Sequence, residues 1–352
     1  MLTVDPHAPY ERPPLSKDYL RGEDTDVTLH PPDWYIERGI ELINARRVEA
    51  IDVISQEVTS DGASYSYQSL VLACGSSPAP LPVPGGDSVL QLRSLSDANR
   101  LRDAAAQAAS AVVIGAGFIG CEAAASLASR GLSVTLLAPD RVPQVKRLGE
   151  EAGSRILGFL ADAGVRYVGG VNVESVGDGA VRLDNGTTVT GELVLAATGI
   201  APRSELARAA GLALSDARIV VRSDMRTSSR HVYAAGDVAS AFNFAAGRPL
   251  AVEHWQDAVD QGRIAGTNAA GGSAKWAGVP GFWTTIGDST LKYHAWGDGY
   301  QQCQFVPHDD GFTVWYETGG AVVGVLTCNA DDDYEKVEHL IKSAMPSPVS
   351  MS

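Results

Sequence analysis

The chain has 352 residues, of which 45% are hydrophobic, and it carries a formal net charge of −14. This length exceeds what one hydrophobic core usually supports, so we expect two or three domains. The acidic balance opposes nucleic acid as a partner, and the lack of a long apolar run or a leader-like start leads us to expect no membrane contact and a cytoplasmic location.

The first fifty residues combine a short apolar stretch, a rigid turn and many positive charges. Residues 1–4 are typical of the end of a β-strand, Pro13 and Pro14 form a turn, and Ser16 with Lys17 is expected to cap and begin a helix. The cations form either a solvated face, which we favour, or a local basic patch. They are Arg12, Lys17, Arg21, Arg38, Arg46 and Arg47.

Two later segments each join an apolar strand to a turn of small residues. They are "SLVLACGSSPAPLPVPG" at residues 69–85 and "ELVLAATGIAP" at residues 192–202, and each is expected where the chain crosses between two domains. A third apolar strand, in "TSSRHVYAAGDVA", ends at Gly236 and Asp237. The carboxylate of Asp237 either accepts hydrogen bonds from a sugar hydroxyl or caps a helix.

The strongest local pattern lies between the two crossing segments. It predicts a buried strand over Ala111–Ile114, an Ala-rich helix that ends at Gly131, and a second strand over Ser133–Ala138. Between the first strand and the helix lies the sequence Gly-x-Gly-x-x-Gly at residues 115–120. Strand, glycines, helix and strand in this order form the fingerprint of a dinucleotide-binding fold.

Each glycine of the fingerprint has its own physical role. Gly115 permits a tight turn, Gly117 lets the backbone approach a pyrophosphate, and Gly120 allows the helix to pack closely on the strand. The helix N-terminus adds backbone amides and a partial positive charge. Glu122 lies just inside this helix, where it either complements the helix dipole or faces a nicotinamide ring, and both interpretations stay open.

The end of the second strand leaves the coenzyme open. An acid that binds the adenosine ribose is expected there, but the strand ends at Ala138, followed by Asp140 and Arg141. Asp140 favours NADH, whereas Arg141 would suit the 2′-phosphate of NADPH.

The C-terminal part predicts antiparallel strands in "GFTVWYE" and "AVVGVLTC", a helix around "DDDYEKVEHLI", and a disordered tail in "PSPVSMS". The cysteines Cys74, Cys121, Cys303 and Cys328 are widely spaced. We therefore expect neither a redox disulfide nor a metal site, and interpret the cysteines as small buried hydrophobic residues.

Taken together, eight segments in order resemble the FAD-dependent pyridine-nucleotide oxidoreductases, and within them the ferredoxin reductase branch. The segments are "PYERPPLSKDYL", "LACGSSP", "LRSLSDANRLR", "GAGFIGCEAA", "GIAPRSELARAAGL", "TSSRHVYAAGDVA", "AVEHWQDAVDQGRIAGTNAAG" and "VPGFWTTIGDSTLKYHAWG". The resemblance covers nearly the whole chain.

The resemblance implies an α/β fold with two Rossmann-like nucleotide-binding domains and a C-terminal α+β domain. The FAD domain would comprise residues 1–80 and 219–277, the NAD(P) domain residues 81–218, and the C-terminal domain residues 278–352. Members of the family begin with a strand, a GxGxxG loop and a helix, a unit of roughly 30 residues that would precede Met1. Either a start site placed too far downstream, which we favour, or a real truncation would explain its absence from the printed sequence.

The resemblance also implies FAD and either NADH or NADPH as cofactors, and it assigns roles to single residues. Lys17 would pair with Glu122 near the flavin N5 as catalytic residues, together with Trp283 beside the isoalloxazine ring. Arg12 would lie along the flavin, Arg93 would contact the flavin or a phosphate, Asp237 would bind a ribitol hydroxyl, and Trp255 would begin the helix facing the flavin pyrimidine. The full cofactor-binding set is Arg12, Lys17, Ala73, Gly75, Arg93, Gly115, Gly117, Phe118, Ile119, Gly120, Glu122, Arg141, Gly199, Asp237, Trp255 and Trp283.

The implied reaction carries electrons from NAD(P)H through FAD to a ferredoxin-like iron–sulfur protein, with the N-terminal arginines as a candidate docking patch. Two alternatives stay open. The segment "FWTTIGD" departs from the family's usual sequence, which leaves room for an NAD(P)H oxidase or a reductase of a small molecule. The missing first glycine loop would also suit a flavin-less nucleotide-binding module. Monomer and homodimer both stay open.

Overall fold

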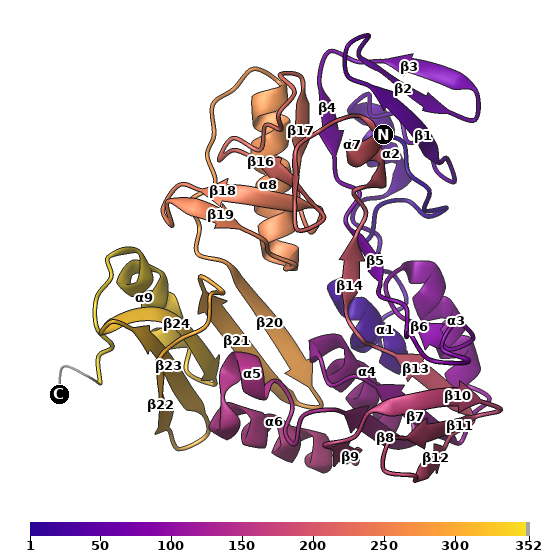
Figure 1. Cartoon of the computed structure of the whole chain (residues 1–352), viewed down its shortest axis with the longest axis vertical. Coiled ribbons are helices and arrows are strands. Elements are labelled where there is room, and N and C mark those ends of the chain that lie inside the picture. The colour runs from indigo at the N-terminus through magenta and orange to yellow at the C-terminus, as the bar shows by residue number, and fades with distance from the viewer. Residues whose placement is uncertain (350–352) are drawn as a thin grey trace.

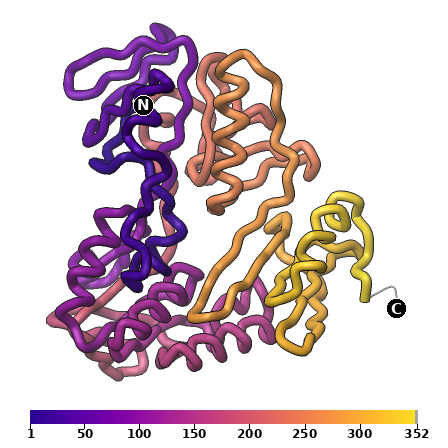
Figure 2. The backbone as a smooth tube through the Cα atoms, turned by 180° about the vertical axis from the view of Figure 1, so that it is seen from behind, coloured from indigo at the N-terminus to yellow at the C-terminus, as the bar shows by residue number. Residues whose placement is uncertain are grey.

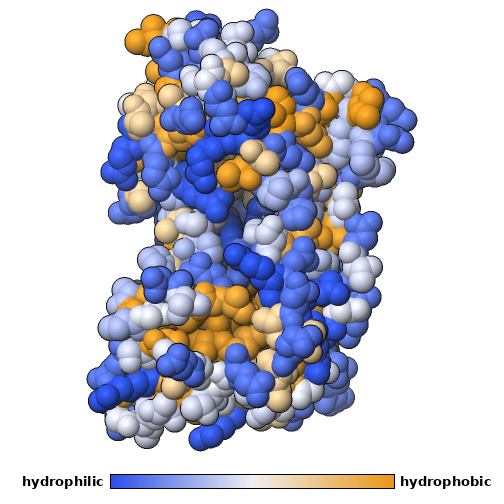
Figure 3. Space-filling view, turned by 90° about the vertical axis from the view of Figure 1, so that its right-hand side faces the viewer, coloured by the Kyte–Doolittle hydropathy of each residue, from blue (hydrophilic) through white to orange (hydrophobic). Residues whose placement is uncertain are grey.

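A computed structural model describes residues 1–349, which form three units around a narrow waist (Figures 1 and 3). We call them the glycine-loop unit (residues 79–199), the β4–β17 unit (residues 1–9, 28–75 and 203–277) and the C-terminal unit (residues 278–349). None of the helices in the described part of the chain combines the length and the apolar run needed to cross a membrane.

The glycine-loop unit is built on a five-stranded parallel sheet with the order β6-β13-β7-β8-β9. Its strands are β6 (Leu90–Gln91), β7 (Ser110–Ile114), β8 (Ser133–Ala138), β9 (Arg166–Gly169) and β13 (Leu193–Ala196). Strand β7 lies at the centre, and its Val113 pairs with Leu195 on one side and Leu136 on the other. The strand order reverses beside β7, which is where such sheets bind nucleotides.

Helices and a small hairpin sheet surround the parallel sheet. Its crossover connections carry α3 (Leu95–Ala105), α4 (Phe118–Ser129), α5 (Val145–Leu148) and α6 (Glu150–Asp162), and the added antiparallel sheet contains β10 (Val173–Gly177), β11 (Ala180–Leu183) and β12 (Thr188–Thr190). The predicted strand–helix–strand pattern is confirmed, and β8 has the expected bounds.

The chain crosses between units at β5 (Ser76–Pro78) and β14 (Ile200–Pro202), which pair antiparallel (Figure 1). This two-stranded connection lies where the sequence predicts both crossings.

The β4–β17 unit is a group of small sheets around a long helix. The parallel strands β4 (Leu70–Leu72) and β17 (Val232–Ala234) pack against α8 (Trp255–Ala269). The other elements are the meander β1 (Val48–Asp52), β2 (Glu57–Ser60) and β3 (Ala63–Ser66), the mixed sheet β15 (Leu214–Ser215), β16 (Arg218–Val221), β18 (Ala239–Asn243) and β19 (Arg248–Leu250), and the helices α2 (Pro32–Glu37) and α7 (Glu205–Ala209).

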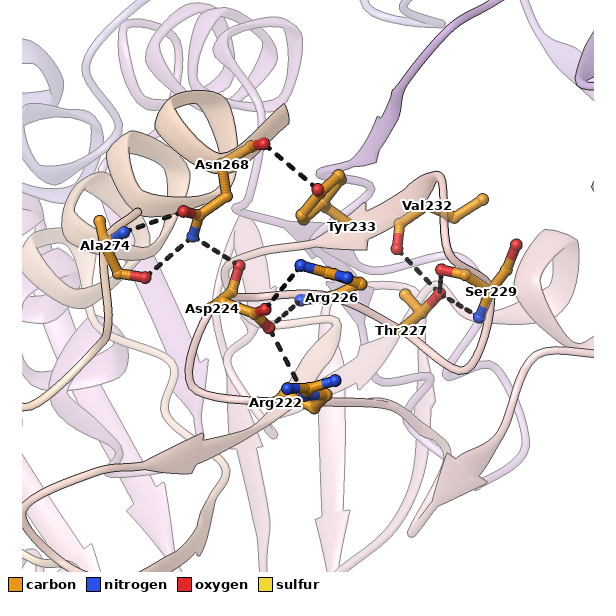
Figure 4. Close-up of polar contacts among 9 residues, drawn as sticks. All are labelled: Arg222, Asp224, Arg226, Thr227, Ser229, Val232, Tyr233, Asn268 and Ala274. Atoms are coloured by element: carbon orange, nitrogen blue, oxygen red, sulfur yellow. Dashed lines mark hydrogen bonds and ion pairs between the residues drawn. The ribbon is translucent and has the colours of Figure 1, made fainter. Parts of the chain in front are cut away.

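A polar network fixes the end of α8 against the loop that leads into β17 (Figure 4). The Asn268 amide donates to the carbonyl oxygens of Asp224 and Ala274, both at 2.9 Å, and accepts a hydrogen bond from the Ala274 N–H. The Tyr233 hydroxyl donates to the Asn268 carbonyl at 3.2 Å. Because Tyr233 lies in β17, the network holds in place the strand that ends just before Asp237.

The C-terminal unit is a five-stranded antiparallel sheet with one helix. Its order is β20-β21-β24-β23-β22, with β20 (Gly281–Ile286), β21 (Ser289–Ala295), β22 (Gln302–Pro307), β23 (Phe312–Thr318), β24 (Ala321–Cys328) and α9 (Asp331–Lys342). The two predicted antiparallel strands and the predicted helix are confirmed.

The division into three domains stays a prediction. Two segments, however, pack against a different unit from the one to which the predicted boundaries assign them. Residues 203–218 carry Ala207 and Leu212, which are buried in the core of the β4–β17 unit rather than the NAD(P) domain. Residues 10–27 form η1 (Pro13–Ser16) and α1 (Asp18–Arg21) and bury Leu20 in the core of the glycine-loop unit. Figure 2 shows this indigo segment descending from one unit to the other.

Several local predictions differ from the structure. Residues 1–4 are expected to end a strand but form only a single β-bridge, between Leu2 and Ile43. Their backbone hydrogen bonds all go to residues 41–46, on one side of the segment. Ser16 caps no helix, since its hydroxyl donates to Glu122 instead. Cys303 is exposed rather than buried.

The tail also differs from its predicted disorder as far as residue 349. Ser347 is fully buried, and its backbone N–H donates to Glu317 at 2.8 Å. Residues 350–352 of the predicted disordered tail lie outside the described residues.

Candidate active site

The glycine loop lies at the carboxyl end of β7, and its geometry requires glycine. Gly115 has a φ of +104°, and a Cβ at this position would lie 2.4 Å from the Ala197 carbonyl oxygen. A Cβ on Gly120 would lie 2.0 Å from the Gly115 carbonyl oxygen. The lack of a side chain at Gly120 therefore lets α4 pack on the end of β7, and the lack of one at Gly115 lets the loop pass close to the segment that follows β13.

The loop leaves room for a phosphate group at the start of α4. A Cβ on Gly117 would meet only the Ala197 carbonyl oxygen, at 4.0 Å, so the space beside this residue is open. Gly117 precedes the helix, and no side chain caps the helix N-terminus. Phe118 and Ile119 open the first turn, and Ile119 is 37% exposed. The uncapped amides and the helix dipole therefore fit a dinucleotide pyrophosphate.

Lys17 and Glu122 form a buried ion pair, as the family resemblance implies. The Lys17 Nζ lies 2.8 Å from the Glu122 Oε2, and the two residues are 8% and 4% exposed. Lys17 also donates to the Pro13 carbonyl at 3.0 Å. A buried lysine with one carboxylate and one carbonyl partner keeps its charge fixed in space, next to the glycine loop.

Two hydroxyl groups that sequence reasoning missed complete the coordination of Glu122. Ser16 donates to Oε2 at 2.5 Å, and Thr284 donates to Oε1 at 2.6 Å. Both residues are buried. The partners lie 106 and 162 positions away from Glu122 in the sequence, so no local pattern could have identified them.

A second cluster surrounds Asp237 at the end of β17. Its carboxylate accepts a hydrogen bond from the Ser76 hydroxyl at 2.5 Å and forms an ion pair with Arg93. Arg93 also donates to the Ser76 hydroxyl at 2.9 Å. Arg12 in turn donates to the Arg93 carbonyl at 2.5 Å. Three of the predicted site residues, Arg12, Arg93 and Asp237, therefore lie together.

The cluster fits a ligand that accepts hydrogen bonds. The Arg93 Nε is buried and has no partner in the described structure. An orphaned guanidinium donor next to a carboxylate suits a group that carries both hydroxyls and anionic oxygens, as the ribitol and phosphates of FAD do.

Trp283 and the start of α8 border a shared cavity of about 280 Å³. Trp283 is 41% exposed, and Trp255 is the first residue of α8, which begins without a side-chain cap. The cavity is lined by Gln256, Asp257, Phe282 and Trp283, among others. The structure thus brings the predicted Trp283 close to the helix that Trp255 opens.

The remaining predicted residues lie in the connecting loops. Gly75 and Gly199 flank the crossing strands with φ values of +61° and +107°, and Ala73 directly follows β4. Arg141 is exposed beyond β8, where Asp140 pairs with Lys146 at 3.0 Å. Both an acid and two cations therefore stand at the expected ribose position, so the structure leaves NADH and NADPH open.

Burial and hydrogen bonding change the ionisation of a tyrosine near α3. The Tyr10 hydroxyl donates to Asp5 at 2.7 Å and accepts from the Leu95 N–H at 3.0 Å. Burial, and then the bond to Asp5, raise the pKa of Tyr10 to about 12. This neutral hydroxyl ties Asp5 to the start of α3.

Most of the N-terminal cations are paired with carboxylates, and their role as a docking patch stays a prediction. Arg21 pairs with Asp18 and Glu23, Arg38 pairs with Glu37, and Arg46 pairs with Asp61. Lys17 is buried against Glu122. Neighbouring carboxylates neutralise most of these charges, so the first fifty residues present a mixed-charge surface.

Comparisons with known proteins agree with this geometry. A family profile described as "Pyridine nucleotide-disulphide oxidoreductase" matches residues 1–262. Putidaredoxin reductase of Pseudomonas putida is 32% identical over 96% of this chain and 84% of its own length. A ferredoxin reductase structure from Rhodopseudomonas palustris covers 99% of this chain and 89% of its own, with a TM-score of 0.92 and 30% identity.

Human apoptosis-inducing factor 3 is 31% identical over 97% of this chain. The chain spans only 58% of the length of that relative. The structure of a covalent putidaredoxin reductase–putidaredoxin complex also matches, with a TM-score of 0.92 and 29% identity over 99% of this chain and 88% of its own.

Proposed function

The chain belongs to the pyridine nucleotide-disulphide oxidoreductase family, and on this premise we propose that it is a flavoprotein that carries electrons from NAD(P)H through FAD to a ferredoxin-like iron–sulfur protein. The buried Lys17–Glu122 pair beside the glycine loop is the observation that carries the proposal. A fixed cation and a fixed carboxylate next to a dinucleotide site suit a reaction in which negative charge develops on a bound ring.

The described residues divide the binding task. Gly115, Gly117 and Gly120 with the start of α4 would hold the NAD(P)H pyrophosphate, while Arg93 and Asp237 would hold FAD. Bound FAD would accept two electrons from NAD(P)H and release them one at a time.

The protein's own groups then supply position and charge. Lys17 presents a positive charge at its Nζ, and Glu122 holds that lysine in place. Trp283, which is part-exposed beside α8, is the residue that we propose as the flavin-side contact nearest to an incoming partner.

The partner and the location are proposals that rest on relatives. The matched putidaredoxin reductase is named for putidaredoxin, and a chain in the structure of a covalent putidaredoxin reductase–putidaredoxin complex has the same fold as this chain. The cytoplasmic location stays a prediction, supported by four cysteines that are all free. Monomer and homodimer both stay open.

The visible absorption spectrum tests the proposal. The purified chain is incubated with FAD, unbound FAD is removed, and the protein is titrated anaerobically with NADH or NADPH. We expect the flavin absorption bands to bleach. The coenzyme that bleaches them at the lower concentration, NADH or NADPH, is the preferred one. Reoxidation is then followed with a [2Fe–2S] ferredoxin and with oxygen as separate acceptors.

Each outcome has one meaning. Faster reoxidation by the ferredoxin than by oxygen supports the reductase, whereas equal rates point to the NAD(P)H oxidase alternative. A chain that binds NAD(P)H and stays colourless after incubation with FAD contradicts the flavoprotein and points to the flavin-less module.

A further inference from the structure

Glu122 is held from both of its carboxylate oxygens. Oε2 receives Lys17 at 2.8 Å and Ser16 at 2.5 Å, while Oε1 receives Thr284 at 2.6 Å. An ion pair made through one oxygen leaves the carboxylate free to rotate about that contact. A donor on the second oxygen fixes the plane of the group as well.

Thr284 is buried within a paired strand. It lies within β20, pairs with Leu291 of β21, and is 0% exposed. Two residues earlier in β20, Phe282 packs on Phe118 of α4, with ring centroids 4.6 Å apart. The hydroxyl is therefore carried by a strand that is anchored to the same helix as Glu122.

Strand alternation separates Thr284 from its neighbours. Side chains at successive strand positions point to opposite faces, and Thr284 is buried while Trp283 is 41% exposed. Thr285 is directed away from Glu122 as well, and its hydroxyl lies 3.0 Å from that of Thr290 across the hairpin. Of the two adjacent threonines, only Thr284 contacts the carboxylate.

We propose that Thr284 is a positioning residue, which orients the Glu122 carboxylate and thereby holds Lys17 at the site of flavin reduction. The inference rests on the proposed function, since it assigns Thr284 to that same site. Because Thr284 lies in β20, this role would make the C-terminal unit part of the nicotinamide site as well as part of the surface that faces a partner. The contact is made by three segments that are distant in the sequence, η1, α4 and β20.

Three variants test the inference in the full chain. Thr284→Val keeps the shape and removes the hydroxyl, Thr284→Ser restores it, and Thr285→Val removes a hydroxyl that does not face Glu122. The first measurement is anaerobic stopped-flow reduction of the FAD-loaded protein over a range of NAD(P)H concentrations. We expect Thr284→Val to lower the limiting rate about tenfold with an unchanged NAD(P)H dissociation constant. Thr284→Ser and Thr285→Val should match the wild type.

A second measurement needs no flavin. Brief acetylation of the flavin-free chain, read by mass spectrometry, compares Lys17 with Lys146, whose side chain is 79% exposed. We expect the labelling of Lys17 relative to Lys146 to rise about tenfold in Thr284→Val, because a loosened Glu122 no longer shields the lysine. The ratio should stay at the wild-type value in the other two variants.

The two readouts separate the possible failures. Unchanged Lys17 labelling in Thr284→Val overturns the inference, and so does increased labelling with an unchanged limiting rate, because Thr284 would then be only a structural tether. If the wild type binds no FAD, the proposed function fails, and the labelling ratio still decides whether Thr284 positions the pair. Should Thr284→Val not fold, Thr284→Ala takes its place under the same criteria.

Discussion

At the scale of single residues, the candidate site is built from paired, buried charges. Glu122 and Lys17 are both buried and paired, and Asp237 is buried against Arg93. Burial also raises the pKa of the Cys121 thiol, which keeps this neighbour of Glu122 uncharged. Such groups act by holding ligands and charge in place, which matches a site where cofactors supply the reactive atoms.

Removing the lysine should slow flavin reduction far more than NAD(P)H binding. Lys17→Ala removes the fixed cation, and we expect the limiting rate of reduction to fall by about 10² to 10³ with little change in the NAD(P)H dissociation constant. Stopped-flow reduction measures both quantities, and Lys336→Ala on the exposed face of α9 is the control. Equal losses in rate and binding would contradict the role of Lys17.

Loss of stability must be separated from loss of function in that variant. Breaking a buried ion pair from one side costs about 3–5 kcal/mol because the other charge is left unpaired. The double variant Lys17→Met with Glu122→Gln removes both charges. We expect it to recover most of the free energy of unfolding while reduction stays slow.

His294 should make the protein less stable in acid. Burial lowers the pKa of His294 more than the Pro280 carbonyl and Glu338 raise it. The unfolded chain therefore binds a proton before the folded one as the pH falls below about 6.5, and the free energy of unfolding decreases there. His294→Phe keeps a ring against Tyr334, whose centroid is 4.5 Å away, but cannot titrate.

Urea unfolding of both proteins at pH 7.5 and pH 5 checks this prediction. We expect a smaller loss of stability in acid for the variant than for the wild type. Equal losses would show that His294 does not contribute to the pH dependence.

At the scale of elements, the glycine loop and α4 are the part of the fold whose packing follows most directly from the sequence. The helix approaches the end of β7 because Gly120 has no Cβ to meet the Gly115 carbonyl oxygen, and Gly115 in turn has none to meet the carbonyl oxygen of Ala197, just after β13. Its first turn then presents uncapped amides at the sheet edge where the strand order reverses. Close packing of the loop thus depends on two missing side chains, and the proposed nucleotide site lies on this same loop.

Two glycine-to-alanine changes in helices should have opposite effects. A Cβ on Gly120 would lie 2.0 Å from a backbone oxygen, so we expect Gly120→Ala to destabilise the fold by about 1–3 kcal/mol and to abolish NAD(P)H binding. Gly158 in α6 is exposed and has no atom within 4 Å of an added Cβ. Gly158→Ala should therefore stabilise by about 0.5–1 kcal/mol.

Thermal unfolding and nucleotide binding by fluorescence check both changes. If Gly120→Ala bound NAD(P)H like the wild type, the close approach of α4 to β7 would not be required for the site.

At the scale of the whole molecule, the cores do not follow the order of the chain. The largest core joins the glycine-loop unit to the C-terminal sheet and includes Leu136 of β8 and Leu291 of β21. A separate core lies in the β4–β17 unit and includes Val232. Residues that share a core are expected to unfold together.

Core variants should reveal this division in calorimetry. Leu136→Ala and Leu291→Ala should each remove about 2–5 kcal/mol and shift the same thermal transition, because both side chains are fully buried in one cluster. Val232→Ala should shift a transition that these two leave in place. If Leu291→Ala moved a transition of its own, residues 278–349 would be an independent domain.

Much of the fold and part of the site could be predicted from the sequence. The bounds of β8, the helix after the glycine loop and the two crossings follow from local patterns of glycine and apolar residues. These patterns work because turn geometry and strand burial depend on neighbouring residues. The family resemblance added the pairing of Lys17 with Glu122, which the structure confirms.

The sequence by itself therefore determined the glycine loop, the α/β class and the family. Only the tertiary structure decided that Thr284 and Ser16 hold Glu122, that Ser76 and Arg93 meet at Asp237, and that residues 10–27 pack on the glycine-loop unit. These contacts join residues up to 162 positions apart. The residues next to a hydroxyl or a guanidinium in the sequence do not determine its hydrogen-bond partner. The partner depends on which surfaces meet when the units pack together.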